Sequence, residues 1–135
     1  MARAKGHTVT LFNATKKVGG CKACDTCWSK GQACSFTDGF TDLEPLLEKA
    51  DTVVFATPMY WFGFSAQIKA AIDRIYAYIS PQTLRPPKIS ENALVSFAGA
   101  TDQHGAAGLV SQFETLNDAI EVRSSRVTYL RGSIG

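Results

Sequence analysis

Residues 52–63 read TVVFATPMYWFG, and this stretch decides the fold. Its apolar part, Thr52–Ala56, predicts a strand of the kind that parallel sheets bury on both faces. Beyond a proline follow Tyr60, Trp61 and Phe62, three large rings that are costly to expose together. Because open α/β sheets bind ligands at the carboxyl ends of parallel strands, these rings are expected to wall a crevice that suits a flat heteroaromatic ring. The alternative is that they pack in a dimer interface.

Strand and helix patterns alternate along the rest of the chain. The expected strands are His7–Phe12, Thr52–Ala56, Asn92–Ala98 and Arg126–Leu130. Three helices are expected. The first begins at Thr41, with Glu44 completing a capping box, and the second is capped by Ser65 and has an apolar stripe of Ile68, Ile72, Ile75 and Ile79. The third has an apolar stripe of Leu109, Phe113, Leu116 and Ile120. This alternation predicts βαβ units in one α/β domain over residues 1–135, with a parallel sheet between two helical layers.

Composition excludes several classes of protein. An apolar content of 45% with 19% charged residues is ordinary for a globular domain. The net charge is only +2, and the basic residues are dispersed, so no nucleic-acid partner is expected. No apolar stretch approaches the roughly 20 residues that span a bilayer, and the N-terminus has no apolar core of a signal peptide. We therefore expect a cytoplasmic protein that has no membrane partner, with cysteines as thiols or ligands rather than disulfides.

Two segments of the sequence resemble the signature of a known protein family. Residues 50–61, ADTVVFATPMYW, match a signature that reads A-D-x-hydrophobics-S/T-P-V-Y-W/F, and residues 65–74, SAQIKAAIDR, match its continuation L-K-x-x-x-D-R. The chain thus resembles the flavodoxin-like, NAD(P)H-dependent FMN reductases. The resemblance implies a three-layer αβα fold, FMN as cofactor, NAD(P)H as electron donor, and a quinone, flavin or similar small molecule as acceptor. It also implies a homodimer or a higher homo-oligomer.

Two loops are expected to contact the flavin ring by the same resemblance. The first comprises Thr57, Pro58, Met59, Tyr60, Trp61, Phe62 and Gly63, of which the backbone N–H groups from Met59 to Gly63 would donate to the ring. The second comprises Gly99, Ala100, Thr101 and Asp102. Asp102 could equally cap a helix. His104 is more typical of a surface histidine than of a proton donor, so no catalytic residue is predicted. Lys69, Asp73 and Arg74 have the spacing of a local ion pair and of a subunit contact.

One part of the family pattern is missing from the sequence. Flavodoxin-like domains bind the FMN phosphate with a Ser/Thr/Gly-rich loop after the first strand, and nothing here fills that role; Gly19-Gly20 is too short. The segment His7–Phe12 would be the family's second strand, so the first strand, which lies inside the sheet, is expected to be absent. The alternative function is therefore a non-catalytic remnant of the fold that binds a metal or a partner.

All four cysteines fall in one predicted loop, with the pattern Cys21-x2-Cys24-x2-Cys27-x6-Cys34. Four thiolates at this spacing suit an iron–sulfur cluster of the 4Fe–4S type. The pattern is similar to the compact motif of iron–sulfur flavoproteins, a branch of this fold family in which the cluster lies near FMN and passes single electrons. Free thiols and a structural zinc ion stay open as alternatives, although zinc sites usually pair two well-separated Cys-x2-Cys halves.

Overall fold

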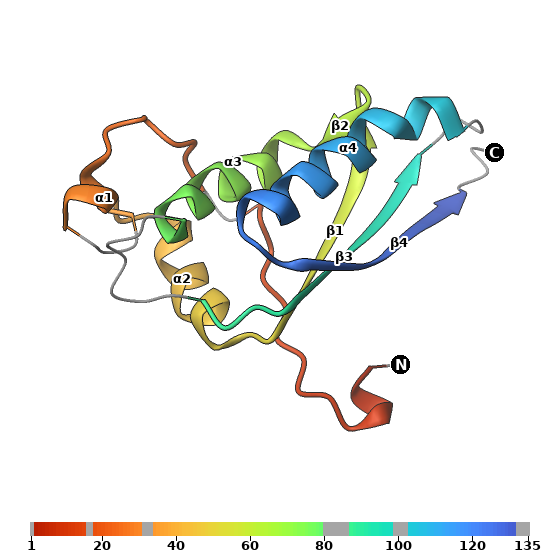
Figure 1. Ribbon diagram of the computed structural model, residues 1–135, viewed down its shortest axis with the longest axis horizontal. Coiled ribbons are helices and arrows are strands. Elements are labelled where there is room, and N and C mark those ends of the chain that lie inside the picture. Colours follow the sequence, from red (N-terminus) through yellow and green to blue (C-terminus); the bar gives the residue numbers. More distant parts are fainter. Residues whose placement is uncertain (1, 16–17, 31–33, 80–86, 99–102, 132–135) are drawn as a thin grey trace.

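The computed structural model of the chain describes residues 2–15, 18–30, 34–79, 87–98 and 103–131. Within these residues, four strands form one sheet in the order β2-β1-β3-β4 (Figure 1). Their bounds are β1 Thr52–Tyr60, β2 Gly63–Phe64, β3 Glu91–Ala98 and β4 Arg123–Arg131. The pairs β1–β3 and β3–β4 are parallel, and only the short β2 is antiparallel to its neighbour. The predicted α/β class with a mostly parallel, flavodoxin-like sheet is confirmed.

In the described part of the chain, three helices precede the sheet in sequence, and the others connect its strands. The bounds of the helices are η1 Arg3–Lys5, α1 Thr26–Lys30, α2 Gly39–Lys49, α3 Ala66–Arg74, η2 Ile75–Tyr78 and α4 Gln103–Ala119, where η denotes a 3-10 helix. Helices α3 and η2 lie between β2 and β3, and α4 lies between β3 and β4. The stripe expected from residue 68 to residue 79 thus runs through α3 and continues into η2. Among the described helices, none combines the length and the apolar character needed to cross a membrane.

The core lies between the helices and one face of the sheet. Phe55 of β1 and Leu94 of β3 are buried there, and the Phe55 ring meets Phe113 of α4 edge to face, with 6.0 Å between centroids. Phe40 of α2 and Ile72 of α3 belong to the same cluster. The predicted helical stripes are therefore confirmed as core-facing at Ile72, Ile75, Leu109 and Phe113, whereas Ile79, at the end of its stripe, is exposed.

The other face of the sheet is more open than the sequence indicated. Buried and accessible positions alternate along β1 and β3, and the side chains of Val54 and Phe97 are 56% and 49% exposed. The prediction that Thr52–Ala56 is buried on both faces is therefore wrong. The reason is that α2, α3 and α4 all pack on the opposite side, so the described residues supply one of the two expected helical layers.

The segment His7–Phe12 forms no strand, and its residues from His7 to Leu11 are exposed, so this prediction is also wrong. Leu11, for example, is 87% exposed. A strand is stable only when a neighbour satisfies its backbone N–H and C=O groups, and the described residues pair none with this segment. Among the described residues, β1 has a partner on one side only from Thr52 to Pro58, and that partner is β3. Such an edge position tolerates Pro58 within the strand, so β1 continues to Tyr60 instead of breaking.

The start of α2 differs from the predicted one by a few residues. Asp38, not Thr41, is the N-cap residue: its carboxylate accepts the Phe40 N–H at 2.9 Å. The Thr41 hydroxyl in turn accepts the Asp38 N–H at 3.3 Å, so a capping box is present with Thr41 in its second position. Glu44, which the sequence placed in that box, is buried against the core.

Candidate functional site

The aromatic turn, residues 60–63, joins β1 to β2 at the carboxyl end of β1. Met59 pairs with Phe64, and Tyr60 pairs with Gly63, which leaves Trp61 and Phe62 as a two-residue loop. The side chains of Tyr60, Trp61 and Phe62 are 60%, 92% and 54% exposed. The position that the sequence predicted for these rings, at the end of a parallel strand, is therefore the position observed.

The backbone of the turn is strained. Trp61 and Phe62 have φ angles of 47° and 66°, the left-handed region that tight hairpins usually fill with Asn-Gly. Bulky side chains adopt this region at a cost of order 1–3 kcal/mol each, and such strain clusters at ligand sites. Three exposed rings on a strained backbone are a poor solution for stability alone. This combination indicates a surface that is shaped for binding.

Buried contacts on both sides hold the turn in place. Thr57, which was predicted to contact the cofactor, is buried, and its hydroxyl oxygen accepts the Ser65 N–H at 3.3 Å and lies 3.2 Å from the Ser65 hydroxyl. Ser65 is the N-cap residue of α3, but its side chain makes no capping bond because it faces Thr57. On the other side, Gly63 packs against the side-chain amide of Gln112 on α4. The sequence did not reveal the contributions of Ser65 and Gln112.

The second predicted ring-contacting loop, Gly99, Ala100, Thr101 and Asp102, lies outside the described residues. Its starting point is nevertheless informative, because β3 ends at Ala98 directly after the residue that pairs with Pro58. The carboxyl ends of β1 and β3 are therefore neighbours at one edge of the sheet. His104 belongs to the first turn of α4, and its side chain is outside the described part of the chain.

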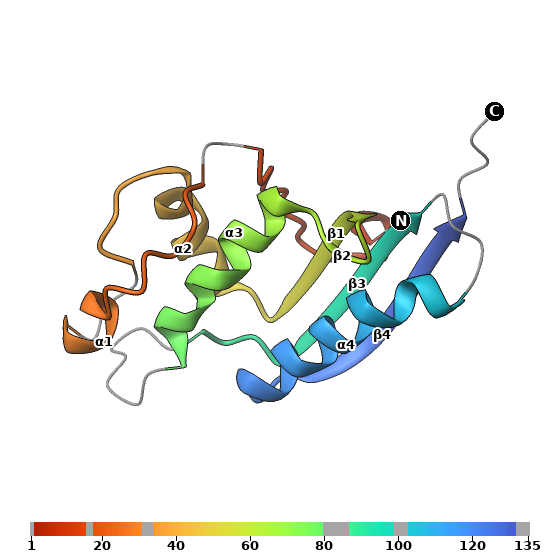
Figure 2. The same ribbon diagram turned by 90° about the horizontal axis from the view of Figure 1, so that it is seen from above.

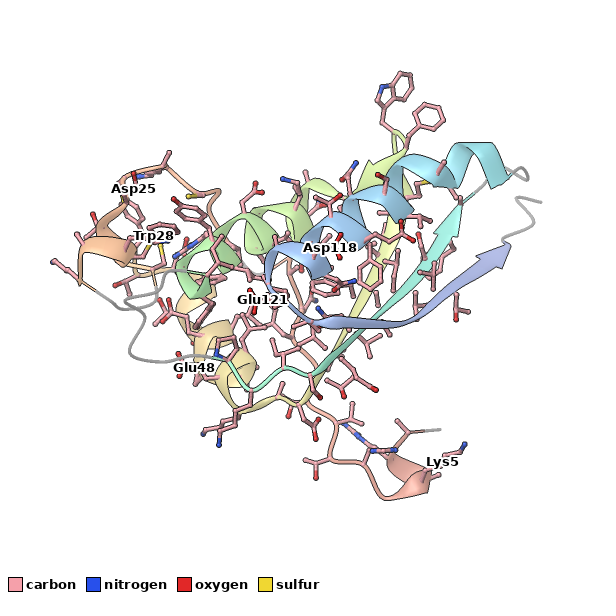
Figure 3. The ribbon with its side chains drawn as sticks, viewed as in Figure 1. Lys5, Asp25, Trp28, Glu48, Asp118 and Glu121 are labelled. Carbon is pink, nitrogen blue, oxygen red and sulfur yellow. The ribbon has the colours of Figure 1, made fainter. Side chains whose placement is uncertain are left out.

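The cysteine hollow, a shallow depression at the other end of α3, contains all four cysteines. Its lining also includes Phe36, Arg74 and Tyr76, and the lining cysteines are Cys21, Cys24, Cys27 and Cys34, none of them in a disulfide. Figure 3 shows Asp25 and Trp28 on the α1 side of this end of the molecule. Trp28 stacks on Tyr76 with 4.9 Å between ring centroids and donates its indole N–H to the Tyr76 carbonyl at 3.0 Å. The short helix α1 is thereby attached to the end of α3.

Backbone strain and hydrogen bonds also distinguish the cysteine segment. Ala23 and Asp25, on either side of Cys24, both have a φ of 51°. The Ala23 N–H donates to the Cys21 sulfur at 3.4 Å, a contact of the kind that adjusts the properties of ligating sulfurs. Hydrogen bonds with Thr26 lower the pKa of Cys24, whereas partial burial raises the pKa of Cys27. The thiols of Cys24 and Cys27 therefore differ in acidity.

Arg74 connects the two ends of the cysteine segment. Its side chain is 2% exposed, and its guanidinium forms a salt bridge with Asp38 at 2.6 Å. The same group donates to the Phe36 carbonyl at 3.0 Å and to the Gly19 carbonyl at 3.4 Å. Asp38 completes the connection by accepting the Gly19 N–H at 2.9 Å. Burial opposes the charge of Arg74, but Asp38 and the Cys34 thiol outweigh it and raise the Arg74 pKa above its ordinary value.

The donor chemistry of the hollow fits a thiolate-ligated metal group, because four sulfurs line one depression beside a buried cation. The distances in this structure are more open than a metal site requires. In the part of the chain that the structure describes, no three His, Cys, Asp or Glu side chains are gathered closely enough to hold a metal ion. Residues 19–38 would therefore have to contract for the sulfurs to share one ligand.

The two sites lie at opposite ends of α3: Figures 1 and 2 show the connection between β1 and β2 near one end of this helix and α1 near the other. The aromatic turn precedes the helix, and the cysteine hollow includes Arg74, the last residue of the helix. Lys69 and Asp73, on an exposed face between the two sites, form the ion pair that the sequence predicted. Arg74 does not share in that pair, because it is buried against Asp38 instead.

Comparison with known proteins then identifies the family. A family model for NADPH-dependent FMN reductases matches residues 1–128. The chain belongs to this family. The predicted family is thereby confirmed. The cysteine spacing suggested the iron–sulfur flavoprotein branch of the family, and the names of the curated relatives described next agree with that branch.

Several curated relatives are named iron–sulfur flavoproteins. One, from Archaeoglobus fulgidus, is 32% identical over 99 residues, which cover 73% of this chain and 44% of the relative. Another, from Methanocaldococcus jannaschii, is 28% identical over 126 residues, which cover 89% of this chain and 62% of the relative. The chain thus spans about half the length of the curated relatives that it matches.

Solved structures confirm the fold at low sequence identity. An NAD(P)H:quinone oxidoreductase from Methanothermobacter marburgensis superposes with a TM-score of 0.70 at 17% identity, covering 98% of this chain and 71% of that one. A general stress protein 14 from Treponema denticola, solved in complex with FMN, superposes with a TM-score of 0.53 at 18% identity, covering 82% and 67%. At this identity the likeness supports the architecture alone.

Proposed function

We propose that this chain is the ring-binding part of an FMN-dependent oxidoreductase that takes electrons from NAD(P)H and delivers them to a quinone, a flavin or a similar small acceptor. The observation that carries the proposal is the aromatic turn, in which Trp61 and Phe62 hold exposed rings on a left-handed backbone at the end of β1. Membership of the NADPH-dependent FMN reductase family supports both the cofactor and the donor.

The residues of the turn would bind and orient the flavin ring. When bound, FMN supplies the chemistry of accepting a hydride and releasing electrons singly or in pairs. The rings of Tyr60, Trp61 and Phe62 would exclude water from one side of it, and the backbone N–H groups of residues 59–63 would donate to its carbonyl oxygens. This division of labour needs no acid–base residue of the protein, in agreement with the lack of a predicted one.

Titration of FMN fluorescence with the full chain tests this proposal. Wild-type protein is expected to quench the flavin, and Trp61→Ala is expected to weaken binding about tenfold because one aromatic contact is lost. Leu11→Ala is the matched control, since Leu11 is also exposed but lies in the N-terminal segment. A wild-type chain that leaves FMN fluorescence unchanged would reject the enzyme function and favour the non-catalytic remnant.

A second candidate function, electron transfer through an iron–sulfur cluster, is favoured by the cysteine hollow. Cys21, Cys24, Cys27 and Cys34 would hold the cluster, which supplies one-electron chemistry. The proposal is supported by the convergence of these sulfurs on one hollow and by the names of the curated relatives. The open arrangement of the thiols requires that residues 19–38 contract when the cluster assembles.

Anaerobic purification followed by iron, sulfide and zinc analysis tests this second function. Iron and sulfide in a 1:1 ratio, with broad visible absorption that is lost in Cys24→Ala, would support the cluster. A zinc content of one per chain would support the structural zinc instead. Protein that contains none of these elements and that assembles no cluster with added iron and sulfide would leave the cysteines as free thiols and reject this function.

We extend the proposal to assembly as a homodimer or a higher homo-oligomer. Two features support it: within the described part of the chain, β1 has no neighbouring strand along one edge from Thr52 to Pro58, and the side chains of Val54 and Phe97 are exposed, and exposed apolar surface favours association. Light scattering coupled to gel filtration measures the mass directly. A monomer at micromolar concentration would contradict this part of the proposal.

A further inference from the structure

Among the described residues that line the cysteine hollow, Arg74 is the most deeply buried charged side chain. The reduction of FMN does not explain why a charge is buried there. The side chain is 2% exposed and lines the hollow together with the four cysteines. Its guanidinium lies 4.4 Å from the centroid of the Phe40 ring, which covers it from the core side. A cation in such a place costs stability unless its partners are arranged around it.

The oxygen atoms that accept hydrogen bonds from Arg74 in the described structure come from the two ends of the cysteine segment. Gly19 is at the first end, and Phe36 and Asp38 are at the second. Asp38 also accepts the Gly19 N–H and caps α2, so the second end is anchored to a helix of the core. The chain between these ends carries all four cysteines. Whatever fixes the two ends limits how far the sulfurs can separate.

One donor of the guanidinium is left without a partner. The Nε of Arg74 is buried and has no hydrogen-bond acceptor among the described residues. A buried donor that is left unsatisfied costs about 1–3 kcal/mol, so it is a candidate for a bond to a ligand. The hollow that Arg74 shares with the cysteines is where an electron-rich acceptor, such as a set of thiolates around a metal, would lie.

We propose that Arg74 is the positioning residue of the cysteine hollow: it holds the ends of residues 19–38 together and faces a thiolate-ligated metal group with its buried charge. The proposal rests on the second function above, because the metal group belongs to that function. Arg74 acts through the cysteines and is no ligand itself. Its planar, forked guanidinium is needed because one side chain must reach a carboxylate and two carbonyl groups at once.

The test uses Arg74→Lys and Arg74→Met in the full chain, with Lys69→Met as the matched control. Lys69 is a cation on the same helix, but it is half-exposed and pairs only with Asp73 in the described structure. Arg74→Lys keeps the charge beside Asp38 and is expected to fold even if Arg74→Met, which leaves Asp38 without its cation, does not. The first readout is amide hydrogen exchange of residues 18–30 in protein without metal.

In metal-free protein, Arg74→Lys is expected to accelerate exchange of the Gly19 amide and of residues 21–30, while Lys69→Met leaves the exchange at the wild-type rate. The second readout is titration with Co²⁺ alone, whose thiolate complexes are coloured. Arg74→Lys is expected to weaken Co²⁺ binding by about 10–100-fold, the usual loss when a contact to the ligands is removed. Folded Arg74→Lys with wild-type exchange and wild-type Co²⁺ affinity would overturn the proposal.

The two readouts separate this proposal from the function on which it rests. If the wild-type chain binds neither Co²⁺ nor an iron–sulfur cluster, the second function fails, and the metal part of the Arg74 proposal fails with it. Faster exchange in Arg74→Lys would still support the connection between the two ends of the segment. If wild-type protein binds metal but Arg74→Lys matches it in both readouts, the function stands and the role of Arg74 is wrong.

Discussion

Gly108 of α4 lies directly against the carbonyl oxygen of Phe62: a Cβ atom at residue 108 would be 2.8 Å from that oxygen. Real Cβ atoms do not approach a backbone oxygen so closely, so a larger residue at this position must displace the turn. The helix therefore acts as a support for the strained loop. This relationship joins an ordinary position in α4 to the residues that we propose for flavin binding.

Gly108→Ala is predicted to weaken FMN binding and to lower the stability of the protein. Alanine stabilises a helix interior by about 0.5–1 kcal/mol relative to glycine, but its Cβ would lie 2.8 Å from the Phe62 carbonyl oxygen and force the backbone of the turn to shift, so we expect a lower thermal midpoint together with a higher FMN dissociation constant. Ala107→Gly at the neighbouring exposed position is the control and should lower stability while leaving FMN affinity unchanged. Unchanged affinity in Gly108→Ala would show that the turn can move freely.

Replacing the strained pair Trp61-Phe62 is predicted to separate stability from binding. The double substitution Trp61→Asn, Phe62→Gly introduces the residues that a two-residue hairpin loop prefers. Because the left-handed conformation costs a bulky residue about 1–2 kcal/mol, the free energy of unfolding without ligand should rise by roughly that amount per replaced residue. FMN binding should fall at the same time. Chemical denaturation and the FMN titration measure the two effects, and a variant less stable than wild type would contradict the strain.

Asn117→Ala is predicted to destabilise the packing of α4 on the sheet. The buried Asn92 amide donates to the Asn117 side-chain oxygen at 2.7 Å. Removing the acceptor leaves the Asn92 donor to find another partner inside the core, and the free energy of unfolding should fall by about 1–3 kcal/mol. Ser111→Ala, at an exposed position of α4, should change it by less than about 0.5 kcal/mol. Equal stabilities of the two variants in urea denaturation would refute the role of this pair.

The salt bridge between Asp38 and Arg74 is predicted to make stability fall in acid. Burial opposes ionisation of Asp38, but hydrogen bonds from Arg74, Gly19 and Phe40 outweigh it and lower its pKa. The stabilisation is therefore complete above the unfolded pKa of aspartate, about 3.9, and is lost as the pH falls through the lower pKa of the folded protein.

Urea denaturation at a series of pH values measures this effect. Asp38→Asn keeps an oxygen that can accept the Phe40 N–H but loses the charge, so it should be less stable than wild type at neutral pH. Its stability should also fall less steeply below about pH 4. If the free energy of unfolding depended on pH in the same way for both proteins, Asp38 would not contribute to the loss of stability in acid.

Periodicity in the sequence was enough to predict most of the architecture. The apolar run before Pro58 and the stripe that includes Leu109 and Phe113 predicted a strand and a helix that the structure confirms, because burial against a core requires these spacings. The family was also predicted correctly from the segment 50–61. The errors arose where a neighbour decides the outcome: residues 7–12 have strand-forming side chains but no paired strand.

The sequence by itself determined which residue types meet the two proposed ligands, namely three consecutive rings at Tyr60, Trp61 and Phe62 and four closely spaced cysteines. Both sets lie on short loops, in which residues that are close in the sequence must also lie close in space. Only the tertiary structure decided how these loops are held. The contact between Gly108 and Phe62 joins residues that lie 46 positions apart in the sequence. The hydrogen bonds among Gly19, Asp38 and Arg74 join residues that lie 19–55 positions apart. Such contacts follow from how helices pack on a sheet, and local sequence patterns do not encode them.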